Sequence, residues 1–503
     1  MSGNPMPQHN LPRSKPQQKN KSTKPVITRH VHTVIIGAGT AGQTAYHAAV
    51  KVTDNVLLIN GGEWNTTCAR VGCMPSKLLI TAANRAYDIN TSEVFGLKST
   101  LKVDAKAVMK RVQLERDFFA NSVLKTVSLF PDQHKLSGYA RFINKNTVQV
   151  GEERIQAQRI VIATGGSPLI PEGWAGKLGK RLLTNESIFE IKKLPKSLAV
   201  IGSGAQGLEL AQAFHRLGVR VKLFNRSEKV GSLTDPALQQ HAVDVFSQEL
   251  DLALGTIIMN VALTDSPKLQ NRTNSKKAQV QITFKNKSGV EQQDTFDYVL
   301  CAITRQPNLG ALDLPTAGID LDQRGIPVGY NPLTGQIGRK PIFIAGDADL
   351  YRPIMHEAVF QGRLSGFNAA RETGVEKSLP MSPLGVIFSE PQMAIVGLNY
   401  RQLTDSQQLF HIGELDFAHQ GRARVMAVKH GKLRLYGDAK TGRLLGAEMF
   451  GPHVEHLAHA VAWMIQHDIS IEQMIRNPYY HPTLEEGLRT ALLRLKHAMQ
   501  QTA

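Results

Sequence analysis

The sequence predicts an α/β protein built around two dinucleotide-binding domains of the Rossmann type. The pattern of a strand, a Gly-x-Gly-x-x-Gly turn and a helix occurs at residues 32–51 and again at residues 198–217. In this pattern the glycines let the backbone pass close to a pyrophosphate, and the N-terminus of the helix attracts its charge. The 503 residues suffice for about three domains. We therefore expect a third domain beside the two that bind nucleotides.

In the first unit each glycine has a separate task. Gly37 makes the tight turn, Gly39 lets the backbone approach a phosphate, and Gly42 permits the helix to pack closely on the strand. The following strand, residues 56–59, ends at Asn60, where the motif usually carries an acid that binds a ribose. We expect Asn60 to hydrogen-bond a ribose hydroxyl without the help of a charge.

The second unit repeats this arrangement with Gly202, Gly204 and Gly207. Two units predict two dinucleotides. The next strand ends at Asn225, followed by Arg226, so the ribose-binding acid is again missing. This leaves both NAD and NADP open, because an arginine at this place can meet a 2′-phosphate.

Hydrophobic patterning places the other elements around these units. Expected helices are residues 43–51, 103–128, 208–217 and 453–467, and expected strands are residues 32–36, 56–59, 138–142, 147–150, 160–165, 198–201, 221–224, 298–303, 342–347, 432–436 and 444–450. Two further strands are expected around a polar, solvated loop at residues 264–277. Cys301, inside an apolar strand, is interpreted as an inert core thiol.

Charge and cysteine content bound the class of protein. The net charge is +17 and the sequence pI about 9.7, but no basic helix or nucleic-acid motif accompanies the charge, so we expect a solvated basic surface and no nucleic-acid partner. Three cysteines in the whole chain indicate a reducing, cytoplasmic setting. No apolar run approaches the length of a membrane span, and no signal peptide opens the chain.

Residues 1–29 contain five prolines and six basic residues without one acid, which predicts a disordered basic tail. A transit peptide is the competing interpretation. It is disfavoured because the tail is rich in lysine and proline, whereas such peptides are rich in arginine and serine.

Residues 67–77 hold two of the three cysteines, Cys68 and Cys73. Five residues of regular helix rise about 7.5 Å, whereas a disulfide needs Cα atoms roughly 4.4 to 6.8 Å apart, so Gly72 has to tighten the turn. A helix N-terminus and a cation such as Lys77 stabilise a thiolate here. We interpret the pair as a working redox couple; the alternatives are a structural disulfide or two unrelated buried thiols.

Around these cysteines the sequence resembles the disulfide-containing flavoprotein reductases, the class I pyridine nucleotide-disulfide oxidoreductases, and within them most closely the dihydrolipoamide dehydrogenases. Their hallmark is a Gly-Gly-x-x-Cys-x-x-x-x-Gly-Cys-x-Pro-Ser-Lys run. Here Gly61 and Gly62 precede the cysteines, but a longer insert, residues 63–67, separates them from Cys68. Matching motifs recur from about residue 33 to 490.

The resemblance implies FAD in the first domain and NAD, with NADP not excluded, in the second. It pairs Lys77 with Glu209 beside the flavin, lets Asp347 bind the ribityl chain, and places Met355 and His356 beside the isoalloxazine. The full set of residues it assigns to cofactor binding is Gly37, Gly39, Gly42, Asn60, Lys77, Ala140, Thr164, Gly165, Gly202, Gly204, Gly207, Glu209, Asn225, Arg305, Asp347 and Met355.

The run Tyr480-His481-Pro482-Thr483-Leu484-Glu485-Glu486 is similar to the His-Pro-Thr-x-x-Glu motif of the same proteins. The resemblance implies that His481 is the acid-base catalyst and that Glu486 orients it. A dihydrolipoyl thiolate would attack Cys68, and Cys73 would leave as a thiolate against the flavin. The histidine then serves the second subunit, so a homodimer is expected, with a lipoyl-bearing protein or free dihydrolipoamide as substrate.

Related activities remain as alternatives. A mercuric reductase carries a C-terminal cysteine pair, and residues 487–503 hold no cysteine. A glutathione reductase usually has lysine where Ser76 stands, and a soluble transhydrogenase would lack a full cysteine pair. A non-catalytic docking subunit would have no reason to keep both cysteines together with His481 and Glu486.

The resemblance also predicts the division of the chain, completing the expected fold: two Rossmann-like domains for FAD and NAD(P) and a C-terminal α+β dimerisation domain. The expected parts are residues 1–29 as tail, 30–190 and 311–378 as FAD-binding domain, 191–310 as NAD(P)-binding domain and 379–503 as interface domain. On the helix at residues 453–467, His453, His456 and His459 recur at every third position. We interpret them as a solvated face, and no metal is expected.

Overall fold

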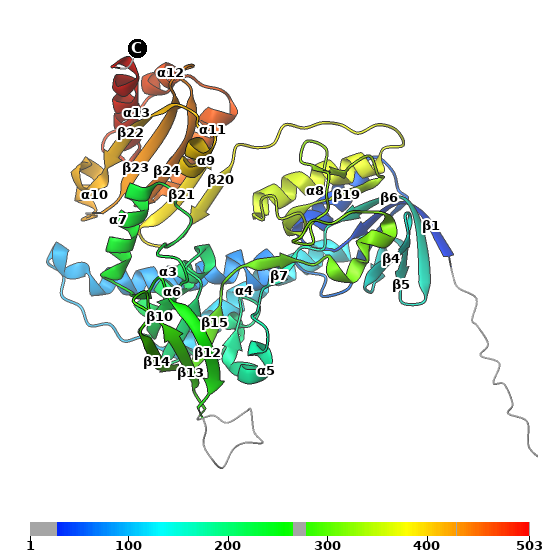
Figure 1. The fold of residues 1–503 in the computed structure, drawn as a ribbon, viewed down its shortest axis with the longest axis horizontal. Coiled ribbons are helices and arrows are strands. Elements are labelled where there is room, and N and C mark those ends of the chain that lie inside the picture. Colours follow the sequence, from blue (N-terminus) through cyan, green and yellow to red (C-terminus); the bar gives the residue numbers. More distant parts are fainter. Residues whose placement is uncertain (1–27, 265–277, 429, 502–503) are drawn as a thin grey trace, which may run out of the picture.

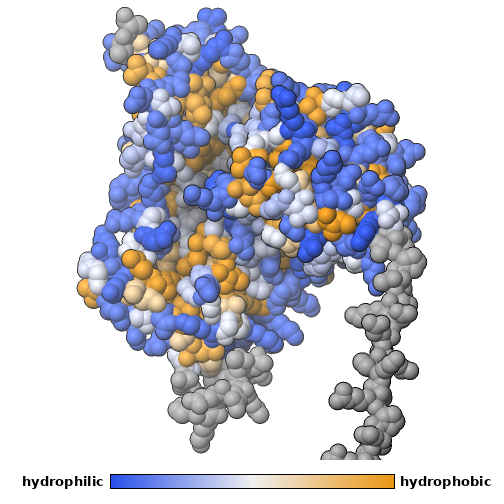
Figure 2. Space-filling model, turned by 45° about the vertical axis from the view of Figure 1, so that its right-hand side comes forward, coloured by the Kyte–Doolittle hydropathy of each residue, from blue (hydrophilic) through white to orange (hydrophobic). Residues whose placement is uncertain are grey.

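The computed structural model describes residues 28–264, 278–428 and 430–501. The predicted tail falls almost entirely outside these residues, and so does most of the predicted polar loop at residues 264–277. The described chain forms three parts, each built on its own β-sheet (Figure 1). Among these residues no helix is long and apolar enough to cross a bilayer, and hydrophilic residues cover much of the face shown in Figure 2.

The first sheet has the order β17-β18-β19-β6-β1-β2-β3, with β4 and β5 beside β6. Its central strand β1 pairs in parallel with β2 and β6, and its last six residues are buried. The strands are β1 (Thr28–Ile36), β2 (Val56–Asn60), β3 (Lys135–Ser137), β4 (Ala140–Asn144), β5 (Thr147–Val150), β6 (Glu153–Ile162), β17 (Tyr330–Asn331), β18 (Gln336–Ile337) and β19 (Ile342–Ile344).

Helices α1 (Thr40–Ala49) and α8 (Met355–Ala370) pack against each other in this domain. Their close approach depends on two glycines, because a Cβ at Gly362 would meet the carbonyl oxygen of Ala41 at 2.4 Å and one at Gly366 that of Ala45 at 2.2 Å. Helix α1 begins three residues before the predicted start, directly after Gly39.

The second sheet has the order β11-β10-β9-β15-β8, and its pairs are parallel. An antiparallel sheet, β12-β13-β14, packs beside it, so the predicted two strands around the polar loop are three. The elements are α5 (Trp174–Leu178), β8 (Leu182–Leu183), β9 (Ser197–Ile201), α6 (Ala205–Arg216), β10 (Arg220–Phe224), α7 (Pro236–Ser247), β11 (Asp251–Ala253), β12 (Ile257–Leu263), β13 (Val280–Lys285), β14 (Glu291–Phe296) and β15 (Tyr298–Cys301).

The sheet partners shift one expected boundary. Strand β8 lies before residue 190 yet pairs with β15 of the second sheet, so the chain enters the second domain earlier than the division expected from the sequence. The two domains are linked by a ribbon of β7 (Gly166–Pro168) and β16 (Arg305–Pro307).

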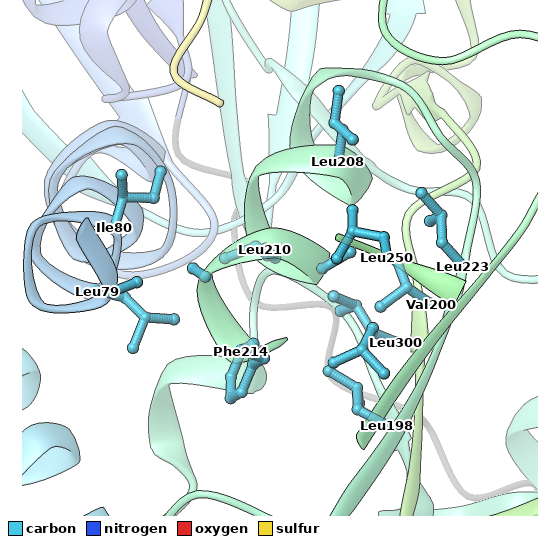
Figure 3. Close-up of a cluster of buried hydrophobic side chains, with 14 of the residues drawn as sticks. Leu79, Ile80, Leu198, Val200, Leu208, Leu210, Phe214, Leu223, Leu250 and Leu300 are labelled. Carbon is cyan, nitrogen blue, oxygen red and sulfur yellow. The ribbon is translucent and has the colours of Figure 1, made fainter. Parts of the chain in front are cut away.

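Two long helices of the first segment, α3 (Cys73–Asn90) and α4 (Ala105–Ser128), pack on the second domain. Leu79 and Ile80 of α3 face Leu210 and Phe214 of α6 in one hydrophobic cluster that also contains Leu198, Val200, Leu208, Leu223, Leu250 and Leu300 (Figure 3). The short helix α2 (Thr67–Val71) precedes α3. Cys73 therefore lies at the N-terminus of a helix that packs on the second domain, and Cys68 lies on the short helix before it.

The third part is an antiparallel sheet, β20-β21-β24-β23-β22, covered by helices. Its elements are β20 (Leu384–Ile387), β21 (Gln392–Gly397), α9 (Tyr400–Asp405), β22 (Phe410–Asp416), α10 (Gly421–Val425), β23 (Lys432–Asp438), β24 (Leu444–Gly451), α11 (Val454–Gln466), α12 (Ile471–Arg476) and α13 (Glu485–Gln500). Separate α and β segments around one sheet make this an α+β domain.

A fully buried glutamate, Glu448 of β24, fastens this domain to the second one. Its carboxylate accepts hydrogen bonds from the backbone N–H of Thr234 at 2.6 Å, of Asp235 at 3.1 Å and of Tyr400 at 2.9 Å. The hydroxyl of Thr234 also donates to it at 2.5 Å. A buried carboxylate satisfied by this many donors fixes two segments far apart in sequence.

We predict that Glu448→Ala destabilises the junction by about 3 kcal/mol or more, because each buried donor left without an acceptor costs roughly 1–3 kcal/mol. The measurement is the first thermal unfolding transition of the purified protein. Glu291→Ala, at an exposed position of β14, serves as control and should change stability by no more than about 0.5 kcal/mol. Equal transitions in the two variants would contradict the role of Glu448.

Candidate functional site

The two glycine turns have the same geometry. Gly37 and Gly202 both adopt φ of 107°, which favours glycine. A Cβ at Gly42 would stand 1.7 Å from the carbonyl oxygen of Gly37, and one at Gly207 would stand 1.8 Å from that of Gly202. The first turn of each helix therefore packs directly against the carbonyl oxygen of its glycine turn and leaves no room for a side chain.

The middle glycines behave differently. A Cβ at Gly39 or Gly204 would meet nothing within 4 Å, so each faces open space at the N-terminus of a helix. This is where a pyrophosphate would be held by backbone N–H groups and the helix dipole. The four packed and two open glycines are the arrangement that two dinucleotides require.

A cavity of about 700 Å³ opens beside the first turn. Its lining includes many of the predicted cofactor residues: Gly37, Gly39, Asn60, Ala140, Thr164 and Gly165. The buried hydroxyl of Thr164 has no hydrogen-bond partner within the described ranges. An adjoining cavity of about 160 Å³ is lined by Gly39, Cys68, Cys73, Gly165, Asp347 and Met355. A long, polar ligand such as FAD fits this connected space.

Most of the hydrogen-bonding capacity of the Asn60 side-chain amide is used by nearby backbone groups. Its Nδ2 donates to the carbonyl oxygens of Gly62 at 2.9 Å and Glu63 at 3.0 Å, and its Oδ1 accepts from the N–H of Ala38 at 3.1 Å. Only the second lone pair of Oδ1 remains for a ribose hydroxyl. At the same rim, Glu63 of the insert that departs from the family pattern forms an ion pair at 3.1 Å with Arg70, which lies between the two cysteines.

The cysteines flank a break between two helices. Helix α2 carries Cys68, α3 starts at Cys73, and Gly72 between them has φ of −128° and ψ of −114°. A Cβ at Gly72 would lie 2.9 Å from the carbonyl oxygen of Thr67, so glycine allows the tight turn that the spacing predicts. The structure shows both cysteines as thiols, which is the reduced form of the pair.

The two thiols have opposite acidities. A hydrogen bond from Cys68 lowers the pKa of Cys73 to about 6, with a further contribution from the Lys77 ammonium. The same hydrogen bond, together with burial, raises the pKa of Cys68. At neutral pH the reduced pair is therefore a Cys73 thiolate that accepts a hydrogen bond from a Cys68 thiol.

Lys77 is held by a contact in which all three domains take part. Its Nζ donates to Glu209 Oε2 at 2.8 Å and lies 4.6 Å from the ring centroid of Phe388. The other oxygen of Glu209 accepts from the backbone N–H of Phe388 at 2.8 Å. The Lys77–Glu209 pair follows the expectation; Phe388 was not predicted, because nothing in a local pattern marks a phenylalanine that meets these residues only in the folded chain.

The return segment brings Arg305 and Asp347 together. Their side chains form an ion pair at 3.4 Å, and Arg305 also donates to the carbonyl oxygen of Gly166. Met355 opens α8 and is half exposed beside the cysteine cavity. The neighbouring His356 is partly buried, and this burial lowers its pKa. Of these side chains, Asp347 and Met355 line the cavity that also contains the cysteines.

In the second nucleotide site, the residue that follows strand β10 is the uncharged Asn225. The Nδ2 of Asn225 donates to Ser227 Oγ at 2.8 Å and to the carbonyl oxygens of Ser227 and Lys229 at 3.1 Å each. Its Oδ1 stays available to accept a ribose hydroxyl. Arg226, Glu228 and Lys229 are exposed next to it, so the rim carries two positive charges and one negative charge.

His481 lies far along the chain, in the third domain. Its Nδ1 is 3.0 Å from Glu486 Oε1 and 3.1 Å from Oε2, and Glu486 also accepts from the N–H of Thr483. Hydrogen bonding to His481 lowers the pKa of Glu486. The imidazole is 81% exposed and is not among the described residues that line the cysteine cavity. Within one chain the dyad and the cysteines are separate.

Two glycine turns, a cysteine pair at the rim of a dinucleotide cavity and a separate α+β domain define a disulfide oxidoreductase with two dinucleotide sites. The family model for pyridine nucleotide-disulphide oxidoreductases matches residues 31–371, and the model of its dimerisation domain matches residues 384–492. The chain belongs to the pyridine nucleotide-disulphide oxidoreductase family, whose members use FAD and a nicotinamide dinucleotide.

Relatives within the family have different activities. The chain is 28% identical to a dihydrolipoyl dehydrogenase from Bacillus subtilis, over 91% of this chain and 97% of that protein. It is 30% identical to a mercuric reductase from Bacillus cereus, over 92% of this chain and 70% of that protein. These similarities confirm the predicted family and leave the substrate to be argued from the site.

Solved structures agree in fold. LpdA from Mycobacterium tuberculosis matches with a TM-score of 0.77 at 20% identity, covering 92% of this chain and all of that one. The HOCl-induced flavoprotein disulfide reductase RclA from Escherichia coli matches with a TM-score of 0.75 at 22% identity, covering 94% and all of that chain. The predicted fold class is thereby confirmed.

We predict that alkylation of the reduced protein by iodoacetamide follows a single ionisation near pH 6, because the Cys73 thiolate forms as the pH rises through its pKa. Lys77→Met should move this midpoint upward, since the ammonium favours the thiolate. Lys110→Met, at an exposed position of α4, should leave it in place. A midpoint near the ordinary thiol value, roughly 8.5, would contradict the assignment.

Proposed function

We propose that this protein is a dihydrolipoyl dehydrogenase: it oxidises dihydrolipoyl groups to the lipoyl disulfide and passes the electrons through the Cys68–Cys73 pair and FAD to NAD⁺. The observation that carries the proposal is the His481–Glu486 dyad, considered together with the acidic Cys73. Similarity to the B. subtilis dihydrolipoyl dehydrogenase over nearly the full length of both chains supports it.

The proton balance of the reaction explains why the dyad favours a dithiol. Oxidation of a dithiol to a disulfide releases two electrons and two protons, so a base must take protons from the substrate. Reduction of a metal ion removes no proton from the substrate and needs no such base. A histidine oriented by a carboxylate is suited to accept and release these protons.

In the proposed sequence His481 takes the proton of one substrate thiol, and the thiolate attacks Cys68 of the oxidised pair. A substrate–Cys68 disulfide forms, the Cys68–Cys73 bond breaks, and Cys73 leaves as a thiolate. The first proton passes from His481 to solvent. The second substrate thiol then gives its proton to His481 and attacks the substrate sulfur bonded to Cys68, which closes the lipoyl disulfide and releases Cys68 as a thiolate. Cys68 takes the second proton from the imidazolium and becomes a thiol. Glu486 stabilises the imidazolium, and Lys77 stabilises the Cys73 thiolate.

FAD, when bound, supplies the two-electron carrier between Cys73 and the nicotinamide. We assign its phosphates to the turn at Gly37, Gly39 and Gly42, its ribityl chain to Asp347, and the neighbourhood of its ring to Lys77 and Met355. The lining of the two adjoining cavities includes Gly37, Gly39, Asp347 and Met355, which supports these parts of the assignment. The remaining proposed contacts are Asn60, Ala140, Thr164, Gly165, Glu209 and Arg305.

The nicotinamide dinucleotide is assigned to the turn at Gly202, Gly204 and Gly207, with Asn225 at its adenosine ribose. The free Oδ1 of Asn225 suits the 2′-hydroxyl of NAD. The neutral amide has no charge to repel a 2′-phosphate, and Arg226 attracts one. We therefore propose NAD as the usual partner with weak discrimination against NADP.

We also propose the domain division expected from the sequence, with β8 reassigned to the second domain. FAD then binds residues 30–190 and 311–378, NAD(P) binds residues 191–310, and residues 379–503 form the interface. The match to a dimerisation domain supports a homodimer as the catalytic unit. The low cysteine content supports a cytoplasmic setting.

The deciding experiment mixes the oxidised, FAD-loaded protein with dihydrolipoamide in a stopped-flow instrument without oxygen. We expect rapid flavin reduction, slowed about 10²- to 10⁴-fold by His481→Gln, the usual contribution of an acid-base group. His497→Gln, on α13, is the matched control. If dihydrolipoamide does not reduce the flavin but the protein oxidises NAD(P)H in the presence of Hg²⁺, the proposal is wrong and the protein is a mercuric reductase.

We also predict that His481 serves the cysteines of the partner subunit. His481→Gln and Cys68→Ser proteins should each be nearly inactive, whereas their heterodimer should recover one of its two sites, because it joins an intact Cys68 to an intact His481. The measurement is lipoamide-dependent turnover after mixing, with heterodimers confirmed by differently tagged chains. Heterodimers without activity would show that each histidine serves its own chain.

A further inference from the structure

A second cluster of potential ligands lies at the start of α11, outside the redox site. One donor atom from each of His453, Glu455 and His456 falls within 4.8 Å of the other two. His456 Nε2 lies 3.6 Å from Glu455 Oε1, and His453 Nδ1 lies 4.0 Å from the same oxygen. The sequence interpretation grouped His453 and His456 with His459, but His459 Nδ1 is engaged at 2.6 Å by the carbonyl oxygen of Glu455.

We propose that His453, Glu455 and His456 form a binding site for a divalent transition-metal ion of the zinc type. The proposal stands on this geometry and does not rest on the substrate proposed above. Two imidazoles and one carboxylate are a recognised zinc ligand set, and a fourth position is left for water.

The backbone gathers the three side chains. His453 has a positive φ of 47°, unusual for a residue with a side chain, and its ring stacks on that of His456 with centroids 6.3 Å apart. The backbone N–H of Glu455 donates to Gln392 Oε1 of β21 at 3.2 Å. The start of α11 is thus fixed to the sheet with both imidazoles on the same side.

The second oxygen of Glu455 supplies independent support. Glu455 Oε2 is buried and has no hydrogen-bond partner in the described part of the chain, although an unsatisfied buried carboxylate oxygen is costly. The imidazoles lie near the other oxygen, Oε1, so a cation held between them satisfies Oε2 when the carboxylate binds it through both oxygens. The side chains of His453 and His456 are 51% and 69% exposed, so an ion can enter from solvent.

Local charge also favours a cation. The carboxylate of Glu390 lies near enough to act electrostatically on His453, although burial raises the pKa of Glu390 and so favours its neutral form. The positive end of the α11 dipole opposes a cation only weakly at this exposed position. Two imidazole nitrogens disfavour Ca²⁺ and Mg²⁺, which take oxygen ligands.

The three side chains have to move closer together to hold an ion. Tetrahedral zinc with ligands about 2.0–2.2 Å away sets the donor atoms roughly 3.3 Å apart, whereas the two histidine–glutamate contacts are 3.6 Å and 4.0 Å and all three donor atoms lie within 4.8 Å of one another. The site borders the second domain, because the carbonyl oxygen of Glu390 accepts hydrogen bonds from Gln212 and Arg216 of α6. A bound ion would therefore strengthen the edge of this domain junction.

The test uses the full-length flavoprotein carrying Cys68→Ser and Cys73→Ser, which removes the thiols as competing zinc ligands. After chelator treatment, Zn²⁺ is titrated by calorimetry and the unfolding temperature is measured with and without Zn²⁺. We expect one Zn²⁺ per chain and a higher unfolding temperature. His453→Ala and His456→Ala should each weaken binding by at least the 10- to 100-fold typical of losing a supporting partner of a metal site.

Two further variants complete the test. His467→Ala, at the exposed end of the same helix, should bind Zn²⁺ like the parent. Glu455→Gln keeps the shape of the side chain and should also weaken binding, so the question remains decidable if a histidine variant folds poorly. Absence of Zn²⁺ binding by the parent, or binding unchanged by His453→Ala, His456→Ala and Glu455→Gln, overturns the proposal.

Discussion

The carboxylate of Glu209 is the contact on which the arrangement of this protein depends. It is buried in α6 of the second domain, receives Lys77 from the helix of the first, and accepts the backbone N–H of Phe388 from the third. Removing one partner of such a pair leaves an uncompensated charge in a poorly solvated place, which is far more costly than breaking a surface ion pair. The domains are thereby held in one relation around the redox helix.

The same contact influences the chemistry. Lys77 is oriented by Glu209 and lowers the pKa of Cys73, whereas the charge of Glu209 by itself would raise it. The pair thus places a cation near the cysteine without exposing that cysteine to the full repulsion of the carboxylate. A contact that positions three domains also sets the acidity of the thiol, so stability and reactivity at this point cannot be varied independently.

The two nucleotide domains pack their glycine turns in the same way. In both, a glycine of positive φ turns the chain, a second glycine sits under a carbonyl oxygen, and the glycine between them faces open space. The third domain solves another problem, because its His481–Glu486 dyad is exposed and separate from the cysteines of its own chain. The match of this domain to a dimerisation-domain model agrees with our proposal that the dyad acts on the cysteines of a partner subunit.

The sequence by itself determined the two glycine turns, the long helix α4, the cysteine pair with its tightening glycine, and the order of most strands. These features depend on neighbours within a few residues, where backbone sterics and hydrophobic periodicity decide the outcome. Tertiary structure alone decided that β8 joins the second sheet and that the backbone N–H of Phe388 donates to Glu209. It also decided that the amide of Asn60 bonds within its own loop and that Glu448 connects two domains by hydrogen bonds. It also gathered Glu455 between two histidines. Each of these contacts depends on backbone paths and side-chain directions that no local pattern records, because burial and hydrogen-bond satisfaction are settled only when distant segments meet.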